Sequence, residues 1–144
     1  MLEDYDREAF CIVNLRNDLS PINMNIVSTG TLNASLAHPR EILKSSVLSN
    51  ASAVMLFHNH PTGNLTPSRE DTEITDRMNQ LFTMIEIPLT NHIIVGNDDR
   101  YYSFKENSLM QVPAQIYVAE PEKIHFTNFV AMMMLEQIRR TKIE

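Results

Sequence analysis

Three residues that are common ligands of zinc stand close together near the middle of the chain. His58 and His60 flank Asn59, and Asp71 follows eleven residues after His60. Side chains alternate along an extended strand, so two histidines in an i, i+2 pair point to the same side of it. Two imidazoles and one carboxylate leave the fourth position of a tetrahedral zinc ion open, as catalytic zinc sites do. The spacing therefore predicts one Zn²⁺ ion held by His58, His60 and Asp71.

The residues around Asp71 also have an ordinary structural interpretation. The run Ser68-Arg69-Glu70-Asp71 has the form of a helix start, with Ser68 as the N-cap and an acidic residue three positions later. The two interpretations are compatible, because a carboxylate in the first turn faces whatever lies against the helix N-terminus, and the helix dipole favours its anionic form. The Ser68 hydroxyl can likewise cap the helix or donate to a developing oxyanion.

A hydrolytic site would also need a general base, a carboxylate that takes a proton from water and passes it to the leaving amine. Glu70 and Glu73 lie on the same expected helix as Asp71, where solvent would surround them. Upstream of the histidines, Glu8 and Glu41 are both candidates. The spacing alone does not choose between them.

Alternating strands and helices are expected to position these residues. Strands are predicted at 9–15, 22–29, 53–57, 92–96 and 101–104, and helices from Pro39 to about Asn50 and over 68–85. The apolar run 53–57 is typical of a central strand, and it would present His58 and His60 at its C-terminal edge. A loop marked by Gly and Pro then leads to the helix that carries Asp71. This alternation predicts an α/β fold in which helices sandwich a mixed sheet.

The composition limits the class of protein. The chain has 144 residues, of which 43% are hydrophobic and 21% charged, as in a soluble domain. A net charge of −6 argues against sequence-independent binding to phosphate backbones, so nucleic acid is not an expected partner. The single Cys11 can form no internal disulfide, and neither a signal peptide nor a membrane-spanning run is visible. These features favour a cytoplasmic protein.

The motifs resemble those of the RadC family. RadC proteins belong to the JAMM (MPN-like, JAB domain) metalloprotease superfamily, whose signature is an upstream Glu, then H-x-H, seven residues, S, two residues and D. The resemblance covers residues 5–106, and its central motif is highly specific. The segments that carry it are Gly30-Thr31-Leu32-Asn33-Ala34-Ser35, His38-Pro39-Arg40-Glu41, His58-Asn59-His60-Pro61-Thr62-Gly63 and Pro67-Ser68-Arg69-Glu70-Asp71.

The resemblance implies a fold, an activity and roles for particular residues. It implies a cytidine-deaminase-like architecture for residues 1–106, with one zinc ion at the histidines and Asp71. Ser68 would support the oxyanion. The upstream Glu of the family stands at the start of the first strand, which favours Glu8 over Glu41 as the general base. The expected activity is zinc-dependent hydrolysis of peptide or isopeptide bonds in a peptide or protein substrate.

Two other functions compete with hydrolysis. One is a non-catalytic module that holds metal and binds a protein, because superfamily relatives often have inactive counterparts. The other is a DNA-repair protein, by the label of the family. RadC proteins usually carry a helix-hairpin-helix segment that has no counterpart in these residues, and this counts against the label.

Some residues receive a purely structural interpretation. His92 is expected to begin a strand and to pack or hydrogen-bond there. Residues 107–144 are expected to form a C-terminal extension with a terminal helix at 126–143. Its run Met132-Met133-Met134 is typical of core or of a dimer surface, so a homo-oligomer is a possible assembly.

Overall fold

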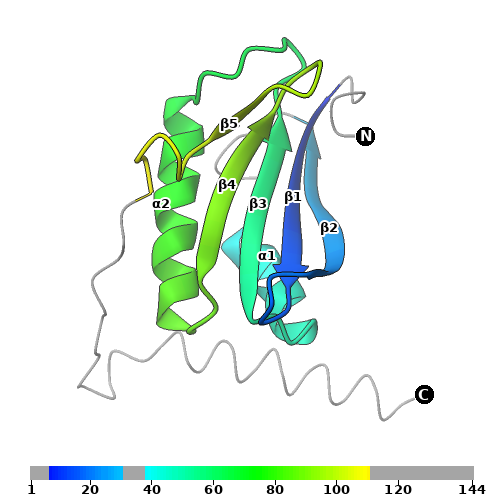
Figure 1. Ribbon diagram of the computed structural model, residues 1–144, viewed down its shortest axis with the longest axis vertical. Coiled ribbons are helices and arrows are strands. Elements are labelled where there is room, and N and C mark those ends of the chain that lie inside the picture. The colour runs from blue at the N-terminus through cyan, green and yellow to red at the C-terminus, as the bar shows by residue number, and fades with distance from the viewer. Residues whose placement is uncertain (1–6, 31–37, 111–144) are drawn as a thin grey trace.

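Five strands of the chain form one mixed sheet, and two helices pack against it (Figure 1). The computed structural model describes residues 7–30 and 38–110. The order of the strands across the sheet is β2-β1-β3-β4-β5. The elements are β1 (Glu8–Leu15), β2 (Pro21–Gly30), α1 (Pro39–Leu48), β3 (Ala53–Asn59), α2 (Arg69–Met84), β4 (Leu89–Val95) and β5 (Tyr101–Ser103).

The strand directions make the sheet mixed. β1 runs antiparallel to both β2 and β3, β3 runs parallel to β4, and β4 runs antiparallel to β5. A parallel pair needs a crossover connection, and α2 supplies it by running back beside the sheet between β3 and β4 (Figure 1). The predicted α/β fold with a mixed sheet is therefore confirmed.

The register of the central strands places the candidate site residues on one face of the sheet. Phe10 of β1 lies opposite His58 of β3, and His92 of β4 lies beside Leu56. Because side chains alternate along a strand, Glu8 shares its face with Phe10. The same register, continued by two residues, brings Glu8 toward His60. The start of β1 and the end of β3 thus meet at one edge of the sheet.

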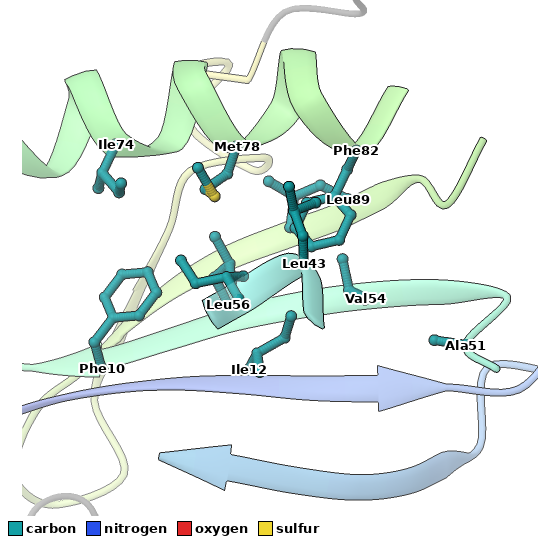
Figure 2. Packing of buried hydrophobic residues seen from close by; sticks show 11 residues of the cluster. Phe10, Ile12, Leu43, Ala51, Val54, Leu56, Ile74, Met78, Phe82 and Leu89 are labelled. Atoms are coloured by element: carbon teal, nitrogen blue, oxygen red, sulfur yellow. The ribbon is translucent and has the colours of Figure 1, made fainter. Parts of the chain in front are cut away.

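A single hydrophobic cluster holds the helices on that face. Ile74, Met78 and Phe82 recur every four residues along α2, so they form one buried stripe that packs over the sheet (Figure 2). Ile42 and Leu43 bring α1 into the same cluster. The strands contribute Phe10, Ile12, Val54, Leu56 and Leu89. This core anchors the start of α2 beside the end of β3.

The elements predicted between residues 9 and 104 all correspond to observed ones, and the bounds of two strands differ in ways that concern the site. β3 continues to Asn59, so His58 belongs to the strand itself. β4 begins at Leu89, three residues before the predicted start. The sequence did not predict this start because Thr90 and Asn91 are polar. Both residues make their hydrogen bonds to neighbouring strands: Thr90 Oγ1 donates to Val54 O at 2.9 Å, and Asn91 Nδ2 donates to Ser103 Oγ at 2.8 Å.

Within the described residues, no helix has the length and apolar character needed to cross a membrane. Residues 111–144, including the predicted terminal helix and its methionines, lie outside the described residues. The division of the chain after residue 106 stays a prediction.

Candidate metal centre

His58, His60 and Asp71 converge where β3 leads into α2. His58 is the penultimate residue of β3, His60 follows the strand, and Asp71 is the third residue of α2. His58 and Asp71 are buried, and His60 is half-buried. The Nε2 atoms of the two histidines are 3.0 Å apart. Asp71 Oδ1 lies 3.1 Å from His58 Nε2, and Asp71 Oδ2 lies 3.2 Å from His60 Nε2.

These separations suit a small divalent cation. Ligand atoms at about 2.0 to 2.1 Å from a tetrahedral zinc ion lie about 3.3 Å from one another. The two nitrogens are 3.0 Å apart, and each lies 3.1 to 3.2 Å from a different oxygen of the Asp71 carboxylate, so these separations are close to that edge length. The residues therefore can hold a metal ion, with one nitrogen from each ring and the carboxylate as ligands.

Burial and hydrogen bonds shift the pKa values of Asp71 and His60. Burial alone would raise the pKa of the Asp71 carboxyl, but hydrogen bonds from His58 and His60 together lower it well below its usual range. The hydrogen bond to Asp71 is the main reason why the pKa of His60 is raised. A proton on the rings stabilises the carboxylate just as a cation between them would, so the site is built for positive charge.

His60 presents a defined nitrogen to this site. Its Nδ1 lies 2.6 Å from the main-chain oxygen of Asn64. A carbonyl oxygen can only accept, so Nδ1 carries the proton and the neutral ring keeps its lone pair on Nε2. The loop makes this contact by turning back at Gly63, which has a φ of +73° and donates its N–H to His60 O at 2.9 Å.

Ser68 and Asp71 form the predicted capping arrangement at the start of α2. The Asp71 N–H donates to Ser68 Oγ at 3.0 Å, and the Ser68 N–H donates to Asp71 Oδ2 at 2.7 Å. The cap therefore orients the Asp71 carboxylate toward the histidines. Because the Ser68 hydroxyl oxygen is the acceptor, the cap does not use the hydroxyl proton. Ser68 is exposed and can donate that proton to a bound molecule.

Glu8 and Glu41 occupy different places. Glu8 is half-buried and lines a cleft of about 420 Å³ together with His60, Ser68 and Asp71. Its negative charge contributes to the raised pKa of His60. Glu41 is exposed on α1 and lines a separate hollow against β2. The structure therefore brings Glu8 to the candidate centre and leaves Glu41 away from it.

The two acidic residues of α2 that flank Asp71 differ as well. Glu70 is exposed and lines the cleft, whereas Glu73 forms an exposed ion pair with Arg69, with 2.7 Å between Arg69 Nε and Glu73 Oε1. Glu70 remains a solvated carboxylate near the site, as expected.

Asn59, between the two histidines, holds the start of β1. Its side chain is buried, accepts a hydrogen bond from the Ala9 N–H at 2.7 Å and donates one to the main-chain oxygen of Arg7 at 3.1 Å. These two hydrogen bonds fix the main chain on both sides of Glu8. No local pattern of residues indicates this role, because the contact joins residues fifty positions apart.

The prediction that His92 begins a strand is wrong, whereas the prediction that it packs or hydrogen-bonds within that strand is confirmed. His92 lies in the interior of β4, has no exposed surface, and its Nε2 is 2.8 Å from Nδ1 of His58. Its Nδ1 is 2.6 Å from Thr75 Oγ1 of α2. The available signal was a histidine within an apolar strand and a threonine one helical turn after Asp71. Neither is conclusive without the parallel pairing of β3 and β4.

Comparisons with known proteins agree with this architecture. A sequence model of the RadC-like JAB domain matches residues 1–109. A UPF0758 protein of Pelodictyon phaeoclathratiforme is 40% identical over 107 residues, which are 74% of this chain and 48% of that protein. One of Symbiobacterium thermophilum is 46% identical over 103 residues, or 72% and 44% of the two chains. The UPF0758 protein YeeS of Escherichia coli is 40% identical over 105 residues, or 73% and 70%. The chain thus spans about half the length of the first two relatives.

Proposed function

Because the chain belongs to the RadC-like JAB domain family, we propose that it is a zinc-dependent hydrolase of peptide or isopeptide bonds that acts in the cytoplasm. The observation that carries the proposal is the convergence of His58, His60 and Asp71 beside an open cleft: the ring nitrogens lie 3.0 Å apart and 3.1 to 3.2 Å from the carboxylate oxygens. The printed names of the relatives state no activity, so the proposal rests on the chemistry of the site.

Zinc bound by these three residues would supply Lewis acidity, which polarises a carbonyl group and makes water more acidic. The Glu8 carboxylate acts as the general base: it accepts a proton from the attacking water and returns it to the departing amine. Its half-buried position in the same cleft as His60 supports this role. The Asn59 side chain keeps Glu8 in place by holding the adjacent main chain.

Ser68 stabilises the negative charge that develops on the substrate. Its hydroxyl oxygen accepts the capping bond from Asp71 N, so its proton is available to donate toward the cleft. Where such a donor has been removed from other hydrolases, the loss was about 3 to 4 kcal/mol of transition-state stabilisation. The arrangement suits an acyl group attached to an amine, as in a peptide bond or in an amide of a lysine side chain.

The test measures zinc content and turnover on the same protein preparations. The parent protein should bind about one zinc ion per chain and hydrolyse members of a panel of fluorogenic peptides and lysine-linked isopeptides. Asp71→Ala should lose zinc, because one of the three ligands is gone. Glu8→Gln should keep zinc but lose turnover by about 10²- to 10⁴-fold, because the amide cannot accept the proton.

Glu41→Gln is the matched control, since it makes the same chemical change at an exposed carboxylate of the other hollow. It should change neither zinc content nor turnover. Zinc binding without hydrolysis across the whole panel would instead favour a module that holds metal and binds a protein. A parent protein that binds no zinc at saturating supply would refute the proposed site itself.

A further inference from the structure

A chain of hydrogen bonds connects His58 to the main chain of Asp71 through two residues on other elements. His58 Nδ1 lies 2.8 Å from His92 Nε2, and His92 Nδ1 lies 2.6 Å from Thr75 Oγ1. The Thr75 hydroxyl donates to the main-chain oxygen of Asp71 at 2.5 Å. His58, Thr75 and His92 are all fully buried. This series of hydrogen bonds therefore begins and ends at candidate metal ligands, and solvent does not reach the residues between them.

The direction of every bond in this chain follows from the Thr75 hydroxyl. A carbonyl oxygen only accepts, so the single hydroxyl proton of Thr75 lies on the Asp71 oxygen. Thr75 Oγ1 must then accept from His92, which places a proton on His92 Nδ1. A neutral His92 consequently has its lone pair on Nε2 and accepts from His58 Nδ1.

We infer that Thr75 and His92 are positioning residues that fix His58 as the tautomer protonated on Nδ1, with the Nε2 lone pair directed at the metal position. The inference rests on the proposed function of this site as a zinc centre. Without such a chain, a buried neutral His58 could carry its proton on Nε2, where an N–H group blocks coordination. A partner on the outer nitrogen of a ligand histidine is known to set both its tautomer and its basicity.

The surroundings of His92 support a neutral and immobile ring. Phe104 stacks on it with ring centroids 4.8 Å apart and planes inclined by 10°, and Phe10 meets it edge-on at 5.6 Å. Complete burial between these rings disfavours a charged imidazole. Apolar walls also prevent the imidazole from turning away from His58. The ring is thus held as a fixed acceptor.

The tautomers can be measured directly on the zinc-loaded protein. Long-range ¹H–¹⁵N correlation spectra of histidine-labelled protein distinguish protonation on Nδ1 from protonation on Nε2. We expect His58 and His92 both to be protonated on Nδ1 only. A His92 ring protonated on Nε2 would overturn the inference, because His58 Nδ1 would then have no acceptor, and this measurement needs no variant and no activity.

A set of threonine variants tests whether the chain matters for metal binding. Thr75→Val keeps the shape but removes the hydroxyl, and it should weaken zinc affinity by about 10- to 100-fold and mix the His92 tautomers. Thr75→Ser should restore both properties. Thr83→Val is the matched control, because Thr83 makes the same bond to a main-chain oxygen four residues earlier, 2.7 Å to Asn79 O, without a histidine partner. It should leave zinc affinity unchanged.

These outcomes separate the inference from the proposed function. If the parent protein binds zinc and hydrolyses peptides while Thr75→Val binds zinc equally well with an unaltered His92 tautomer, the inference fails and the function stands. If the parent protein binds zinc without hydrolysis, the spectra and the affinities still decide the inference. Should Thr75→Val not fold, the tautomer in the parent protein decides it alone.

Discussion

At the scale of single residues, the outer nitrogen of each ring determines what the ligand nitrogen can do. His60 Nδ1 bonds to the Asn64 main-chain oxygen, and His58 Nδ1 bonds to His92. Both contacts direct Nε2 toward Asp71, although one partner is a loop carbonyl and the other a buried ring. The residue between the two histidines points elsewhere, because neighbours on a strand face opposite sides. Asn59 uses that side to hold the main chain around Glu8.

The variant Asn59→Leu should separate the placement of Glu8 from the binding of metal. Leucine has similar size but leaves the buried Ala9 N–H without its acceptor, so we expect a loss of about 1 to 3 kcal/mol in the free energy of unfolding. Turnover should fall because Glu8 is no longer fixed, whereas zinc content should persist. Urea unfolding, elemental analysis and peptide hydrolysis measure the three quantities. The control Asn17→Leu changes an exposed amide in the turn between β1 and β2 and should alter none of them; equal turnover in both variants would contradict the role of Asn59.

At the scale of the elements, the first turn of α2 serves both the helix and the site. The capping box satisfies main-chain N–H groups that would otherwise lack partners, and the same bonds orient the Asp71 carboxylate toward the histidines. The helix N-terminus also favours the negative charge of Asp71. The hydrogen bonds between Ser68 and Asp71 that cap the helix therefore also place the Asp71 carboxylate at the candidate site.

Substitutions of Ser68 can distinguish these two contributions. Ser68→Ala should cost about 1 kcal/mol of stability through the lost cap and should lower turnover by about 10²- to 10³-fold through the lost donor. Ser68→Asp retains a capping oxygen but has no hydroxyl, so it should keep most of the stability and still lose turnover. Ser68→Thr should preserve both. Thermal unfolding and hydrolysis assays provide the readouts, and an active Ser68→Asp protein would exclude the oxyanion role.

At the scale of the whole molecule, the site lies at the edge where the parallel strands β3 and β4 end. Ligand sites of α/β sheets commonly lie beyond the carboxyl ends of such strands. The loop after β3 is supported by the turn after β4. A Cβ on Gly96 would meet Leu65 Cδ2 at 2.6 Å, and one on Gly63 would meet Asn97 Nδ2 at 3.3 Å. Close packing of these two loops stabilises the segment that carries His60.

Burial of Cys11 in β1 makes the stability of the fold depend on pH. Burial raises the pKa of this thiol to about 11, whereas the pKa of a thiol in an unfolded chain is about 8.5. The unfolded state therefore releases the proton first, so this contribution to stability is complete below about pH 8.5 and is lost as pH rises toward 11. Relative to Cys11→Ala, the free energy of unfolding should fall by up to about 3 kcal/mol across that interval.

Urea unfolding of the two proteins at several pH values measures this difference, and other titrating groups cancel in the comparison. The cavity left in Cys11→Ala adds a cost that does not vary with pH. Parallel pH profiles of the parent protein and the variant would show that the thiol titrates normally in the folded state.

The sequence by itself determined the features that depend on near neighbours. The i, i+2 histidines, the capping box at Ser68 and the apolar periods of the strands and helices all follow from local geometry, so the α/β class and the ligand set were predictable. The early start of β4 was not, because its polar residues make their hydrogen bonds to other strands.

Only the tertiary structure decided which distant residues accompany the candidate metal ligands. The antiparallel register of β1 with β3 brings Glu8 to the cleft and leaves Glu41 on another face. The parallel pairing of β3 with β4 sets His92 beside His58, and the packing of α2 adds Thr75. Contacts between residues tens of positions apart depend on strand order and register, which a single sequence encodes only through the packing of the whole core.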